Sequence, residues 1–162
     1  MTYQLSNAIQ VGEDQIFIGI THGLLGAHLG VAYQDTSGTP KLLHLAFHKR
    51  LMLDPYPEND WLFCKFPIDE DVGAQIVALL NASAKLYANQ ISPSSFDYGI
   101  NLFAGQGCIA ADGSYSSKDG CDGYTCSSFT AEIFRSFGLS PRSRCATQPG
   151  SSPNFAYYTK TQ

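Results

Sequence analysis

The chain has few charged residues and no long apolar run, and these absences exclude several classes of protein. Of its 162 residues only 15% are charged, and the formal net charge is −4, whereas nucleic-acid binding needs clustered Lys and Arg. No run approaches the roughly 18 apolar residues of a membrane-spanning helix, and the N-terminus lacks the basic and apolar regions of a secretory signal. We therefore predict a protein that is cytoplasmic as synthesised, with no nucleic-acid partner and no stable membrane insertion. Export by a route without a cleavable signal stays open.

Tight metal-ligand motifs are also missing. The five cysteines form an odd set in which no CxxC pair occurs. Disulfides are rare in the cytosol, so at least one cysteine is expected to be free for other chemistry. A zinc site made of Cys108, Cys121, Cys126 and a histidine stays open as an alternative, although its spacing is looser than zinc sites usually show. We expect no metal and no other cofactor.

Apolar residues make up 44% of the chain, enough for one domain, 1–162, with a buried core. Apolar alternation predicts strands over 15–21, 27–34, 41–51 and 61–68, with a hairpin loop at 35–40. Helical spacing begins at Asp69 and returns over 126–138, where Gly138 is well placed to end the helix. Residues 90–123 are rich in Gly, Ser and Asp and are predicted to form mostly loop that shapes a binding cleft. The predicted order is strands, helix, loop, helix, which is an α+β fold.

Cys126 stands at the start of the last predicted helix. Backbone N–H groups and the helix dipole at that position stabilise a thiolate and make a cysteine a better nucleophile. The alternative is a structural role, because cysteine is among the residues most often buried in a core.

Two histidines occupy equivalent places on neighbouring predicted strands. His28 and His44 both lie opposite the apolar side of their strands, so strand pairing would bring them together on one face. A cysteine nucleophile needs a base, and that base needs a third group to orient it. The alternative is that both histidines are structural. His22 replaces His28 if the register is shifted, and His48 shares a face with His44 and is a second candidate for the third position or a substrate contact.

Three segments together resemble a known superfamily. AHLGVAY, then LLHLAFH, and much later TCSSFTAEIF are similar to the permuted NlpC/P60 superfamily of papain-like proteins. The likeness is to its lecithin:retinol acyltransferase-like branch and related bacterial cysteine hydrolases. The resemblance implies an α+β, papain-like, circularly permuted fold with a small antiparallel sheet and a C-terminal nucleophile helix packed on it. It also implies Cys126 as nucleophile, His28 as base and His44 as the orienting residue. The segment 90–123 has no counterpart in this pattern.

The expected function is that of a cysteine peptidase or amidase that hydrolyses its substrate through a thioester acyl-enzyme. The expected substrate is a peptide or an acyl-amide, and a partner protein such as an inhibitor or a delivery protein stays open. One alternative is a lipid acyl hydrolase or acyltransferase of the same fold, but the sequence shows no amphipathic basic helix of the kind that binds membranes. The other alternative is a non-catalytic domain that binds a peptide or a partner.

Overall fold

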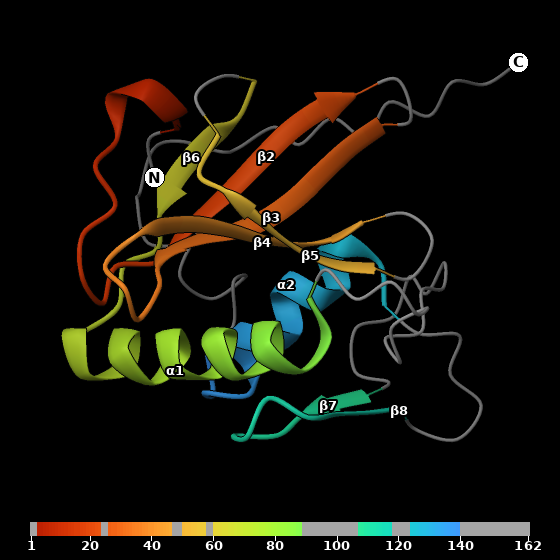
Figure 1. Cartoon of the computed structure of the whole chain (residues 1–162). Helices are drawn as coiled ribbons and strands as arrows, with labels where there is room; N and C mark the ends of the chain where they lie inside the picture. The colour runs from red at the N-terminus through yellow and green to blue at the C-terminus, as the bar shows by residue number, and fades with distance from the viewer. Residues whose placement is uncertain are drawn as a thin grey trace, which may run out of the picture.

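The computed structural model describes residues 3–23, 26–46, 50–57, 60–88, 107–117 and 124–139. These residues form an α+β fold in which two helices lie on one side of a six-stranded antiparallel sheet (Figure 1). The sheet has the strand order β1-β6-β2-β3-β4-β5. Its strands are β1 (Gln4–Leu5), β2 (Phe17–Gly23), β3 (Gly26–Gln34), β4 (Pro40–Ala46), β5 (Arg50–Pro55) and β6 (Leu62–Lys65). The other elements are the 3-10 turn η1 (Ser6–Ala8), the helices α1 (Glu70–Tyr87) and α2 (Cys126–Arg135), and the hairpin strands β7 (Gly107–Ile109) and β8 (Tyr115–Ser117).

Strands β2 to β5 follow one another as antiparallel neighbours, and β6 then returns to pair with β2 at the other side. The turn after β3 is stabilised by Asp35, whose carboxylate accepts hydrogen bonds from the backbone N–H groups of Ser37 and Thr39, each at 2.9 Å. Gly38 in the same turn has φ +77°, a conformation that glycine adopts without strain. The hairpin predicted from the sequence at 35–40 is therefore confirmed.

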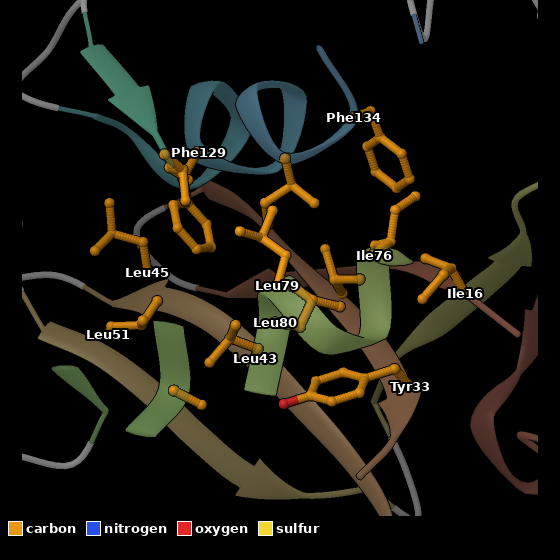
Figure 2. Close-up of a cluster of buried hydrophobic side chains, with 14 of the residues drawn as sticks. Ile16, Tyr33, Leu43, Leu45, Leu51, Ile76, Leu79, Leu80, Phe129 and Phe134 are labelled. Carbon is orange, nitrogen blue, oxygen red and sulfur yellow. The ribbon is translucent and has the colours of Figure 1, made fainter. Parts of the chain in front are cut away.

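The main hydrophobic core lies between the sheet and the two helices (Figure 2). Val31, Tyr33, Leu43 and Leu45 point to this side because side chains alternate along a strand. Figure 2 shows Phe129 on the Leu45 side of the cluster, so α2 begins toward the end of β4 that carries Leu45. The helices contribute Ile76, Leu79 and Leu80 from α1 and Phe129, Ile133 and Phe134 from α2.

The opposite face of the sheet carries a second, smaller cluster. Its fully buried members include Ala32 and Phe63, with Trp61 packed against them. Gly19 is in close contact there, because a Cβ at this position would come within 2.4 Å of the Phe63 ring. Larger neighbours therefore fill the space that small residues such as Gly19 and Ala32 leave on this face. The cluster consists of Val11, Phe17, Ala32, Leu42 and Phe63, with Ile9, Tyr56 and Trp61 at its edge.

Two predicted elements differ from the structure. The strand expected over 41–51 is divided, because β4 ends at Ala46 and β5 runs from Arg50 to Pro55. Apolar residues continue to alternate on both sides of this reversal, so the hydrophobic pattern gives no sign of it. Within 90–123, β7 and β8 form a hairpin whose strands have three residues each, too few to show a period. Residues 90–106 and 118–123 and the chain after 139 lie outside the described residues.

Candidate functional site

The structure brings His28 and His44 into direct contact. Nε2 of His28 and Nδ1 of His44 are 2.7 Å apart and share a hydrogen bond. The two strands approach closely here because Gly30 has no side chain, and a Cβ at that position would lie 3.0 Å from Cβ of His44. Strand pairing therefore produces the meeting of two histidines that the sequence predicted.

Asp54 extends this pair into a chain of three residues. Its Oδ2 lies 2.8 Å from Nε2 of His44, so His44 is held on both ring nitrogens. The side chain of His44 is only 11% exposed, whereas that of Asp54 is 45% exposed and faces solvent. We refer to Asp54, His44 and His28 as the Asp–His–His chain.

Sequence reasoning missed Asp54, because the hydrophobic pattern gives no sign that β4 and β5 are separate strands. Asp54 lies in β5 opposite Leu42, and His44 lies opposite Met52, so both polar side chains lie on the same face of neighbouring strands. A single strand over 41–55 would hold Asp54 far from His44, and only the antiparallel pairing of β4 with β5 brings the two side chains together. The prediction ended that strand at Leu51.

Trp61 forms the apolar wall of the site, and it also escaped prediction. Its ring lies 5.9 Å from the ring of His28 and 6.0 Å from that of His44, measured between centroids. It also stacks on Phe63 of the second cluster, with 18° between the ring planes. This contact depends on β6 pairing with β2, which no local pattern in the sequence reveals.

The electrostatics of the site favour a neutral His28. Burial, and secondly the positive charge of a neighbouring His44 when it is protonated, lower the pKa of His28 from its ordinary value of 6.5. At neutral pH the ring therefore carries one proton and keeps one basic lone pair. This is the state in which an imidazole acts as a general base.

Cys126 lies at the first position of α2, as the sequence predicted. Thr125 caps the helix, since the Ser128 N–H donates to Thr125 Oγ1 at 3.2 Å and the Thr125 N–H donates to Ser128 Oγ at 2.8 Å. The side chain of Cys126 is partly exposed, and its thiol is free. The end of a helix with this reciprocal cap is well ordered, and its remaining N–H groups favour a negative charge nearby.

Among the described residues, no hydrogen bond connects Cys126 with His28 or His44. Helix α2 packs against β3 and β4 through the main core, whereas His28 and His44 face Trp61 on the other side of the sheet. The helix begins toward the end of β4 that carries Leu45, the neighbour of His44 (Figure 2). The start of α2 and His44 thus lie toward the same end of β4, on opposite faces of the sheet.

The structure places none of the alternative site residues that it describes beside the Asp–His–His chain. His22 is exposed in β2 and lies on the same side as Ile18, away from His28. His48 and Cys121 lie outside the described residues, while Cys108 is exposed in β7. Among the residues that the structure describes, no group of three or more His, Cys, Asp or Glu side chains is placed to hold a metal ion.

We compared the chain with protein-family models, with curated proteins and with solved structures. None of them matches. Within the described residues, neither helix combines the length and the apolar character needed to cross a membrane. The functional argument therefore depends on the geometry of the site.

Proposed function

We propose that the protein is a cysteine-dependent hydrolase of amide or peptide bonds, with a circularly permuted papain-like fold of the NlpC/P60 type. In this proposal Cys126 is the nucleophile, His28 the general base and His44 the residue that orients it. The observation that supports the proposal is the Asp–His–His chain, in which a half-buried neutral imidazole is held by a second imidazole, which is held in turn by a carboxylate. A base oriented by a third group is the arrangement that acyl-transfer enzymes use to activate a nucleophile.

The reaction has two steps. His28 takes the thiol proton of Cys126 while sulfur attacks the substrate carbonyl, and the C–N bond breaks as the same proton is returned to the departing amine. Water then attacks the thioester, again giving a proton to His28, and the acid leaves as the thiol is restored. Backbone N–H groups at the start of α2 are suited to stabilise the oxyanion in both steps.

The proposal requires the thiol to reach Nδ1 of His28, because Nε2 of that ring is already bonded to His44. The start of α2 lies toward the same end of β4 as His44 but on the opposite face of the sheet, so this approach has to be made around that end. The shape of the surrounding cleft would come in part from residues 90–123.

The deciding experiment is alkylation of the folded protein by iodoacetamide across a pH series, with the rate at each cysteine read by mass spectrometry. We expect Cys126 to be alkylated faster than an ordinary exposed thiol at neutral pH. In His28→Ala the rate at Cys126 near neutral pH should fall by about 10²-fold, the lower end of what general-base assistance contributes. Activity on amide and ester substrates should fall in the same variant.

Cys108 is the internal control, because it is exposed and free but lies in the strand β7 and not at the start of a helix. Its rate should follow that of an ordinary thiol in both proteins. The proposal is wrong if Cys126 reacts no faster than Cys108 and its alkylation rate is the same in His28→Ala.

The placement of the histidines on the face away from α2 favours one second candidate function. In it, His28 takes a proton from a water molecule that attacks an ester, and Cys126 has only a structural role. Cys126→Ser separates the two candidates: the first predicts a loss of hydrolysis comparable to that of His28→Ala, and the second predicts that hydrolysis persists.

A further inference from the structure

We infer that Asp54 is a positioning residue that fixes the direction of both hydrogen bonds in the Asp–His–His chain, so that the basic lone pair of His28 lies on Nδ1. The direction of the bonds follows from the two contacts together with the donor and acceptor capacity of an ionised carboxylate and of neutral imidazoles. The use of that lone pair to accept the proton of a nucleophile rests on the function proposed above.

The argument begins at the carboxylate. An ionised carboxylate only accepts hydrogen bonds, so the 2.8 Å contact requires a proton on Nε2 of His44. A neutral imidazole carries one proton, so Nδ1 of His44 is then an acceptor. The 2.7 Å contact to His28 therefore requires the proton of His28 to be on Nε2. This leaves Nδ1 of His28 as the one basic ring atom without a bond to His44.

Without Asp54 the opposite direction becomes available. His44 then carries its proton on Nδ1 and donates to Nε2 of His28, which places the His28 proton on Nδ1. In that state the free atom of His28 is a donor and cannot act as a base. In the two states the protons of both rings lie on opposite nitrogens. The carboxylate of Asp54 therefore decides whether Nδ1 of His28 can accept a proton.

The low exposure of His44 explains why water does not set the direction of the two hydrogen bonds in place of Asp54. The side chain of His44 is only 11% exposed, and Trp61 packs against both imidazoles. Asp54, by contrast, is 45% exposed, so solvent screens much of its charge. Its effect on the chain is therefore expected to come from hydrogen-bond direction more than from charge.

The test reads the ring protons directly. Two-bond ¹H–¹⁵N correlation spectra of the ¹⁵N-labelled full chain distinguish the two neutral tautomers of each histidine at neutral pH. In the unchanged protein we expect the Nε2–H tautomer for both His28 and His44. In Asp54→Asn and Asp54→Ala we expect an Nδ1–H population that rises in both rings together, and Asp54→Glu should restore the original state.

The matched control is Asp60→Asn, which removes the same charge from an exposed residue beside Trp61. It should leave both tautomers unchanged. Far-UV circular dichroism shows whether each variant is folded. The inference is overturned by an Nδ1–H tautomer of His28 in the unchanged protein, or by folded Asp54 variants whose tautomers do not change.

The rate of Cys126 alkylation separates this inference from the proposed function. We expect Asp54→Asn to lower the His28-dependent rate about tenfold, less than the about 10⁴-fold seen where a carboxylate contacts the catalytic histidine directly. If the tautomers change in the Asp54 variants but the alkylation rate of Cys126 does not depend on His28, the inference holds and the proposal of a cysteine nucleophile is wrong. If the alkylation rate of Cys126 depends on His28 but the tautomers do not change in the Asp54 variants, the inference is wrong and the proposal of a cysteine nucleophile is supported.

Discussion

At the scale of single residues, the chemistry of the site is set by the neighbours of the histidines. Gly30 lets β3 and β4 approach closely enough for the two rings to share a hydrogen bond. Trp61, the residue before β6, packs against both rings, and Asp54 accepts a hydrogen bond from the far nitrogen of His44. A histidine on an exposed strand would titrate near its ordinary value, whereas this environment keeps His28 neutral.

The lowered pKa of His28 predicts how stability depends on pH. The unfolded chain binds a proton at His28 near pH 6.5, whereas the folded protein binds it only at lower pH. Between these values the unfolded state binds more protons, so the free energy of unfolding rises with pH. The contribution of His28 to this free energy is progressively lost as the pH falls below 6.5. Urea unfolding followed by circular dichroism at several pH values from 5 to 7 measures this slope.

The comparison variant is His28→Gln, which keeps a polar side chain and removes the titration. Its unfolding free energy should depend less on pH over the same range, since the contribution of His28 is absent. Equal slopes in the two proteins would mean that His28 has the same pKa in the folded and unfolded chains.

At the scale of elements, the start of α2 combines a structural and a chemical role. The reciprocal bonds between Thr125 and Ser128 satisfy backbone groups that the first turn leaves open. Thr125→Ala removes the side-chain acceptor, and we expect a loss of about 0.5–2 kcal/mol in the free energy of unfolding. Urea unfolding measures this loss.

The reactivity of Cys126 gives a second reading of the same variant. If the capped first turn supports the reactivity of Cys126, Thr125→Ala should slow the alkylation of Cys126 at neutral pH and leave the rate at Cys108 unchanged. Thr125→Ser keeps the cap and should resemble the unchanged protein in both measurements. A Thr125→Ala protein as stable as the original would show that the cap is dispensable.

Elements with a clear period were predictable from the sequence, and relations between distant elements were not. The alternation around His28 and His44 places both on one face, and the helical stripe that includes Phe129 predicts α2 correctly. The reversal between Ala46 and Arg50 has no hydrophobic signal, so Asp54 was assigned to no strand. The position of Trp61 depends on which strand β6 joins, and that choice is made by the packing of the whole sheet.

At the scale of the whole molecule, one sheet separates two apolar clusters. The main core holds both helices on one face, and the second cluster holds Trp61 on the other. The strands are common to both, since each contributes alternate residues to the two faces. Loss of either cluster therefore removes support from the same backbone, which predicts that the described fold unfolds as one unit, in agreement with a single domain.

Two probes test this prediction in one urea titration. Trp61 is the single tryptophan of the chain, so fluorescence reports the face with the second cluster, while far-UV circular dichroism reports α1 and α2 on the other face. A single domain should give coincident transitions. As a reference, Phe134→Ala removes a ring that packs 4.2 Å from Phe66 in the main core and should lower the free energy of unfolding by about 3–5 kcal/mol. Because the strands are shared, that loss should shift the fluorescence transition as far as the dichroism transition, and a shift in dichroism alone would mean that the two faces unfold independently.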